Sequence, residues 1–68
     1  MNTYVLFIET NSYQCELDYD NIDEAIDEYI NQLPSLSGMK WSEITLSRFD
    51  HRTGDSYLIR KAHFEGEI

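Results

Sequence analysis

The stretch Asp20-Asn-Ile-Asp-Glu-Ala-Ile-Asp-Glu-Tyr-Ile-Asn-Gln-Leu33 decides how the rest of the chain can fold. Its apolar residues recur at intervals of three and four, which places them along one side of an α-helix. Asn21, with Glu24 three residues later, is close to a helix-capping box, and Pro34 is expected to end the helix after Leu33. The apolar side of this predicted helix consists of Ile22, Ala25, Ile26, Tyr29, Ile30 and Leu33.

The opposite side of the predicted helix is almost entirely acidic. It carries Asp20, Asp23, Glu24, Asp27 and Glu28, with no Lys or Arg among them. Acids in the first turn favour the helix N-terminus through its dipole, which explains Asp23 and Glu24. Asp27 and Glu28 each repeat the charge of the acid four residues earlier, which costs roughly 0.2–0.5 kcal/mol per pair. A solvated outer face and a functional acidic surface are therefore both open interpretations.

The composition outside the helix predicts a small β-sheet. Four stretches have the residue types of β-strands, and the second of them alternates cleanly between apolar and polar residues; they are residues 3–10, 13–19, 41–49 and 56–64. Asn11-Ser12 is a turn signal, and the polar segment 50–55, with Gly54, has the composition of a hairpin loop. Short hairpins imply antiparallel pairing. We therefore expect an α+β fold: a single small domain over residues 1–68, in the order ββαββ, with an antiparallel four-stranded sheet and one helix packed on one face.

Further details of the sheet follow from its alternation. The first strand is apolar on both faces, as expected for a central strand, and Ile44 and Leu46 should point inward from the third. The second strand has an acidic outer face, which suits an edge, and we expect the strand order 2-1-4-3 or a relative of it. Residues 65–68 are expected to form a frayed tail. The second strand alternates between Tyr13, Cys15, Leu17 and Tyr19 on one side and Gln14, Glu16 and Asp18 on the other.

The net charge of −8 is concentrated in the first part of the chain. Residues 1–39 contain eight acids and no base, whereas residues 40–68 contain five of each. Such a field repels nucleic acid and anionic membranes and attracts basic surfaces. One cysteine excludes an intramolecular disulfide, and the chain shows neither a signal peptide nor a membrane-spanning run. We expect a cytoplasmic protein, and its length allows a monomer or a homodimer.

The sequence offers no strong catalytic or metal-binding motif. Cys15 with His51 or His63 is a conceivable nucleophile pair, but Cys15 falls on the apolar side of its strand, where a thiol is inert. An EF-hand loop that began at Asp18 would need Gly and Glu where the chain has Asp23 and Tyr29. We therefore expect no enzyme activity, no catalytic residue, no cofactor and no metal.

In its small size, concentrated acidity and lack of catalytic motifs, the chain resembles the small acidic inhibitors that bacteriophages encode, namely anti-CRISPR and antirestriction DNA-mimic proteins. The resemblance covers properties and not aligned residues. It implies an inhibitor in the host cytosol that occupies the basic nucleic-acid-binding site of a defence protein, such as a CRISPR effector or a restriction enzyme, without binding nucleic acid itself. The acids of the second strand are expected to extend the helix surface. The expected partner-binding residues are Glu16, Asp18, Asp20, Asp23, Glu24, Asp27 and Glu28.

A second resemblance is to HicB-type antitoxins. Tyr4-Val-Leu-Phe7 and Asp23-Glu-Ala-Ile26 resemble the N-terminal hairpin and the acidic, alanine-containing helix of that family. The chain departs from the family where Leu17-Asp-Tyr-Asp20 replaces its Pro-Asp and Pro-Gly-Cys region. The alternative function is therefore an antitoxin, or another small protein–protein interaction module, whose acidic helix is only a solvated face.

Overall fold

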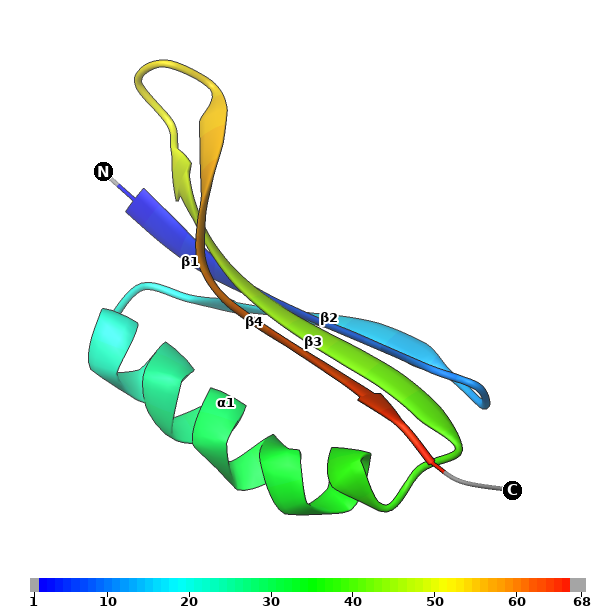
Figure 1. Cartoon of the computed structure of the whole chain (residues 1–68). Coiled ribbons are helices and arrows are strands. Elements are labelled where there is room, and N and C mark those ends of the chain that lie inside the picture. Colours follow the sequence, from blue (N-terminus) through cyan, green and yellow to red (C-terminus); the bar gives the residue numbers. More distant parts are fainter. Residues whose placement is uncertain (1, 67–68) are drawn as a thin grey trace.

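The computed structural model describes residues 2–66 and shows a four-stranded antiparallel sheet with one helix against one face (Figure 1). This arrangement confirms the predicted α+β fold of order ββαββ. In chain order the elements are β1 (Asn2–Thr10), β2 (Gln14–Tyr19), α1 (Ile22–Ser37), β3 (Trp41–Asp50) and β4 (Asp55–Glu65).

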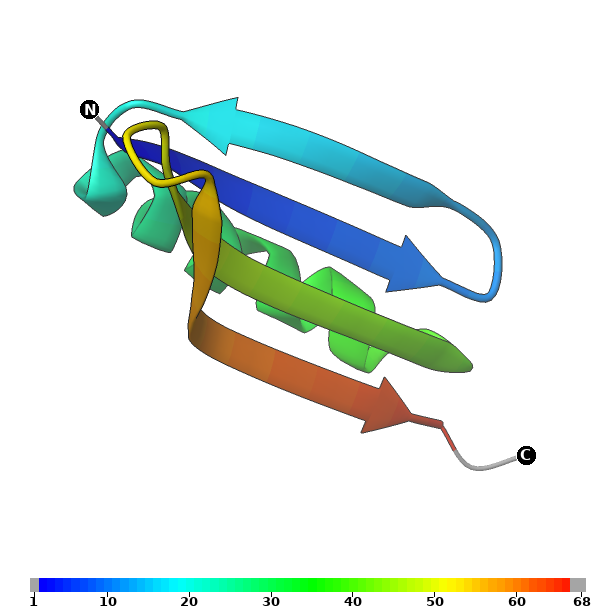
Figure 2. The ribbon, with the colours of Figure 1, turned by 90° about the horizontal axis from the view of Figure 1, so that it is seen from above.

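The strands lie in the order β2-β1-β3-β4 (Figure 2). The central place of β1 and the edge place of β2 are as predicted, but β3 and not β4 lies beside β1, so the predicted order 2-1-4-3 is wrong. Leu6 pairs with Leu46, and Ile8 pairs with Ile44. All four side chains are at most 1% exposed, so pairing β1 with β3 buries them together, whereas β4 is exposed along most of its length.

Helix α1 begins as predicted but ends later. Asn21 caps it, because the Asn21 Oδ1 accepts a hydrogen bond of 2.7 Å from the backbone N–H of Asp23. The helix continues through Pro34 to Ser37, so the prediction that Pro34 ends it is wrong. Leu36 in this last turn is fully buried in the core. Its packing offsets the backbone hydrogen bond that Pro34 cannot donate.

The core lies between α1 and the face of the sheet that α1 covers. Ser42 is buried there too, and its Oγ donates a hydrogen bond of 2.8 Å to the backbone oxygen of Leu36. This bond ties the end of α1 to the start of β3. The buried apolar side chains are those of Leu6, Ile8, Ala25, Tyr29, Leu36, Ile44 and Leu46, which includes the predicted inward pair of β3.

Several apolar side chains of α1 and β4 remain outside the core. Ile22 and Ile30 of the predicted helix stripe are 37% and 52% exposed, so the stripe is wider than the part that the sheet covers. In β4, Tyr57 and Ile59 are 44% and 40% exposed because this part of the strand extends beyond α1 (Figure 1). Ala62, nearer the end of β4, packs against the core instead.

The distal part of the β3–β4 hairpin, residues 47–58, forms an arm that bends away from the helix (Figures 1 and 2). At the bend, the register of the β3–β4 pairing shifts by one residue. Leu46 pairs with Arg60, whereas the next residue of β3, Ser47, pairs with Leu58. Ile59 is therefore an extra residue in β4, and a bulge of this kind bends a hairpin. The tip is a four-residue turn in which Gly54 has a φ of 78°, as the predicted hairpin loop requires.

The end of the chain is more ordered than predicted. Glu65 belongs to β4 and pairs with Trp41, and the backbone N–H of Gly66 donates a hydrogen bond of 2.8 Å to the oxygen of Lys40. The predicted frayed tail is therefore wrong for residues 65 and 66. Its remainder, residues 67 and 68, lies outside the described residues.

Candidate functional site

The seven acids predicted to bind a partner lie on two different sides of the molecule. Glu16 and Asp18, which we call the strand pair, stand opposite Phe7 and Val5 and face away from α1, because Leu6 between those two points into the core. The predicted extension of the helix surface onto this strand is therefore interrupted by the sheet. The other five acids, which we call the helical group, are Asp20, Asp23, Glu24, Asp27 and Glu28.

The helical group is open to solvent and has no basic partner. Glu28 is half-buried, and the other four acids are exposed. The Glu28 Oε2 accepts a hydrogen bond of 2.7 Å from the Gln32 side chain. Across residues 2–66, the ion pairs involve only Glu43, Lys61, His63 and Glu65. No base in the described chain therefore forms an ion pair with the helical group.

A tyrosine joins the helical group to the edge of the sheet. The pKa of the Tyr19 hydroxyl is raised above its ordinary value, first by burial and then by the negative charges of Glu28 and Glu24. Tyr19 thus stays a neutral phenol at physiological pH, which can donate a hydrogen bond. The acidic surface of α1 therefore adjoins a neutral hydroxyl donor as well as the Gln32 amide.

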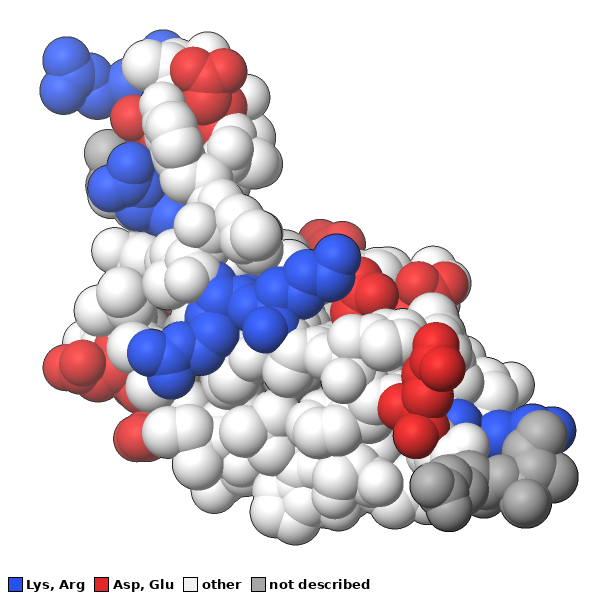
Figure 3. Space-filling view, viewed as in Figure 1, with Lys and Arg blue, Asp and Glu red and all other residues white. Residues whose placement is uncertain are grey.

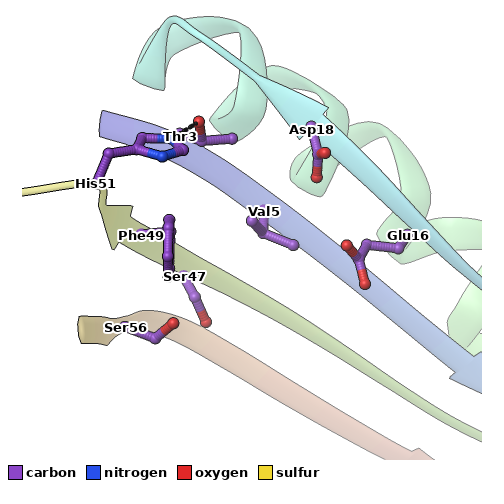
Figure 4. Close-up of a pocket in the computed structure, with 8 residues that line it drawn as sticks. All are labelled: Thr3, Val5, Glu16, Asp18, Ser47, Phe49, His51 and Ser56. Atoms are coloured by element: carbon purple, nitrogen blue, oxygen red, sulfur yellow. Dashed lines mark hydrogen bonds between the residues drawn. The ribbon is translucent and has the colours of Figure 1, made fainter. Parts of the chain in front are cut away.

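The strand pair lines a hollow on the open face of the sheet, between β2 and the arm (Figure 4). The hollow has a volume of about 460 Å³. Val5 and Phe49 supply apolar lining, and the hydroxyls of Ser47 and Ser56 lie on the side of the arm (Figure 4). The hollow thus combines two carboxylates with an aromatic ring and hydroxyl groups.

One histidine holds the arm beside the open face. His51 Nε2 and Thr3 Oγ1 are 2.6 Å apart and share a hydrogen bond, which connects the end of β3 to the start of β1. The rings of His51 and Phe49 meet edge to face, with centroids 4.9 Å apart. These two contacts set the position of the arm and so the shape of the hollow.

The basic residues are separate from the helical group. Figure 3 shows basic side chains on the arm and in a band beneath it, with acidic side chains to either side of that band. The Arg48 guanidinium lies 4.8 Å from the centroid of the Tyr57 ring, a cation–π contact. Lys61 Nζ lies 3.4 Å from a carboxylate oxygen of Glu43. Arg48 and Lys61 therefore contact the arm and β3, and neither forms an ion pair with an acid of α1.

Other chemistry considered from the sequence finds no matching geometry. Cys15 pairs with Ile8 and packs against the core, whereas His63 pairs with Glu43 on the opposite face of the sheet. No three His, Cys, Asp or Glu side chains within residues 2–66 are grouped so as to hold a metal ion. Helix α1 is too short and too polar to cross a membrane.

Sequence reasoning found the acids but missed the hollow. Its neutral lining, Val5, Ser47, Phe49 and Ser56, has no spacing that marks a site. The one local signal was the alternation of β2, which correctly separated Glu16 and Asp18 from Cys15. No protein-family model matches the chain, and no curated protein or solved structure matches it.

Proposed function

We propose that this protein is a non-enzymatic inhibitor that presents an acidic, nucleic-acid-like surface to the basic nucleic-acid-binding site of a host defence protein, such as a CRISPR effector or a restriction enzyme. One observation carries the proposal. The five carboxylates of the helical group lie in the first half of α1 and just before it, and no base within residues 2–66 forms an ion pair with any of them.

The unpaired state of these acids is unfavourable for the protein alone. Asp23 and Asp27, like Glu24 and Glu28, repeat the same charge at a helical spacing of four, where a lysine would stabilise the helix. Each repulsive pair costs roughly 0.2–0.5 kcal/mol. A basic partner would reverse this cost, and no internal ion pair would have to break when it binds.

The chemistry of the helical group suits a site built for phosphate. Arg and Lys side chains that bind phosphate oxygens also form charge-assisted hydrogen bonds with carboxylates. Neighbouring carboxylates on a helix lie ~5–6 Å apart at Cβ, so several can reach one basic groove at once. Long-range attraction would accelerate the encounter, and salt would weaken it. The helical group is therefore the principal contact surface in this proposal.

The proposal is tested with the triple variant Asp23→Asn/Asp27→Asn/Glu28→Gln in nucleic-acid cleavage assays on a panel of purified CRISPR effectors and restriction endonucleases. The parent should inhibit its target at about one copy per nucleic-acid site, and excess nucleic acid or raised salt should relieve the inhibition. The variant should lose roughly tenfold or more in potency, since each exposed charge pair contributes about 0.2–1 kcal/mol.

A matched control removes the same amount of charge elsewhere. The variant Glu9→Gln/Asp55→Asn/Glu65→Gln also loses three acids but leaves the helical group intact. It should inhibit like the parent if position matters and lose as much potency as the triple variant if only net charge matters. Urea denaturation verifies that both variants are folded. Equal inhibition by the parent and the helix variant would show that α1 is only a solvated face.

A further inference from the structure

The hollow between β2 and the arm is lined by two further acids, Glu16 and Asp18, that form no ion pair within residues 2–66. We infer that it receives an arginine side chain of the partner protein, with Glu16 and Asp18 forming its anionic wall. The inference rests on the proposed function, because it names the partner group that this part of the predicted acidic surface would take.

The first step is the charge of the wall. Glu16 and Asp18 are alternate residues of one strand, so their side chains share a face at a separation of ~6.7 Å. Both are exposed, and neither belongs to an ion pair within the described range 2–66. Lys61, on the same open face, pairs with Glu43. The wall therefore lacks a cation of its own.

The second step is the shape and lining of the hollow. Its volume of about 460 Å³ accommodates a long side chain, and Val5 and Phe49 offer an apolar surface for the methylene stem. The edge-to-face contact with His51 holds the Phe49 ring in place. The hydroxyls of Ser47 and Ser56 can accept additional N–H bonds (Figure 4).

The third step is the choice between cations. A guanidinium is planar, weakly hydrated, able to stack on an aromatic ring and able to donate to two carboxylates at once. A lysine ammonium is compact and strongly hydrated and makes no such stack. Because the hollow combines an aromatic ring with paired carboxylates, arginine fits it better than lysine. The same carboxylates disfavour an anion or a neutral apolar ligand.

The test is an amide NMR titration of the isotopically labelled full chain with three small probes. N-acetyl-arginine methylamide carries the planar, positively charged guanidinium group. N-acetyl-lysine methylamide carries a positive charge on a non-planar ammonium group, and N-acetyl-citrulline methylamide carries a planar but neutral ureido group. Shifts should appear at residues 16–18 and 47–51 and should be largest with the arginine probe, smaller with lysine and absent with citrulline. Equal shifts with citrulline, or shifts confined to α1, would overturn the inference.

Variants of the lining give a second measurement. Glu16→Gln/Asp18→Asn should weaken binding of the arginine probe about tenfold, because two exposed charge pairs are lost. Phe49→Leu should weaken it less and reduce the preference for arginine over lysine. The control Glu9→Gln/Glu65→Gln changes the net charge equally, outside the hollow, and should bind the probe like the parent. Unchanged binding by the Glu16/Asp18 variant would contradict the inference.

These measurements contain no target enzyme, so the two proposals can fail separately. Binding of the arginine probe in the hollow, combined with equal inhibition by the parent and the helix variant, would retain the arginine site and reject the proposed role of α1. Potent inhibition that depends on α1, without binding of the arginine probe at residues 16–18, would do the reverse.

Discussion

The two faces of the sheet use the same strands differently. On the covered face, Leu6 and Leu46 meet under α1 and are fully buried. On the open face, Val5, Phe7 and Phe49 are only half-buried, and the arm is the one element that bends toward it. A ββαββ chain has one helix and can close one face completely. Stability is therefore concentrated on one face, and the other is left for polar and acidic side chains.

The open face itself is divided. Toward the end of β4, acids and bases of neighbouring strands pair: His63, opposite Glu43, and Lys61, opposite Thr45, each lie 3.4 Å from a carboxylate oxygen of Glu43. Toward the arm, Glu16 and Asp18 face the hollow without forming an ion pair, and His51, which also lines the hollow, bonds to Thr3 instead. In the part near the end of β4, a base that lies near an acid on the neighbouring strand forms an ion pair with it. The unpaired acids on β2 and α1 arise because residues 1–39 contain no base.

The largest expected effect comes from breaking the covered face. Leu46→Ala should lower the free energy of unfolding by about 2–5 kcal/mol, because it removes a fully buried side chain and leaves a cavity. Val5→Ala on the open face should cost about 1 kcal/mol, since that side chain is only half-buried. Urea denaturation of both variants measures the difference. Equal losses would mean that the open face contributes as much to stability as the core.

The next effect concerns the hydrogen bond beneath the end of α1. Ser42→Ala should lower the free energy of unfolding by about 0.5–1.5 kcal/mol, because the fully buried serine hydroxyl loses its hydrogen bond to the Leu36 oxygen, which keeps the backbone N–H of Met39 as a donor. Ser47→Ala, on the open face of the same strand, should change stability by less than ~0.5 kcal/mol. Denaturation midpoints decide the comparison. A similar cost at both positions would show that the bond to Leu36 adds nothing.

The smallest effect is pH-dependent and lies on the open face. The pKa of His63 is raised above its ordinary value, chiefly by its hydrogen bond to Glu65. Partial burial of the ring lowers the pKa. The hydrogen bond to Glu43 and the negative charge of Glu43 raise it further. The pKa of His63 in the folded protein therefore exceeds its ordinary value of about 6.5. The interaction of protonated His63 with Glu65 and Glu43 stabilises the fold fully below pH ~6.5, and this stabilisation is lost as the pH rises through the raised pKa.

The unfolding midpoint of the parent should therefore decrease as the pH rises through this range. The decrease should be smaller in the His63→Gln variant, and added salt should make it smaller in the parent as well. An NMR titration of the His63 ring measures the pKa directly. A ring that titrates at or below the ordinary value would contradict the assigned pairing with Glu65 and Glu43.

The sequence by itself determined those features that depend on neighbours a few residues away. The spacing of apolar residues predicted α1, and Asn21 marked its start. Alternation predicted β2 and placed Glu16 and Asp18 on the side opposite Cys15, and Gly54 marked the hairpin turn. The class of fold followed from these elements, and so did the acidity of the outer side of the helix.

Only the tertiary structure decided the features that depend on distant contacts. Burial of Leu36 carries α1 past Pro34, and the pairing of β1 with β3 sets the strand order. The covering helix determines which side of β2 meets solvent, so the predicted single acidic surface becomes two. The bulge at Ile59 accompanies the bend that brings the arm to the hollow. These outcomes arise from packing between segments far apart in the chain, which local periodicity does not encode.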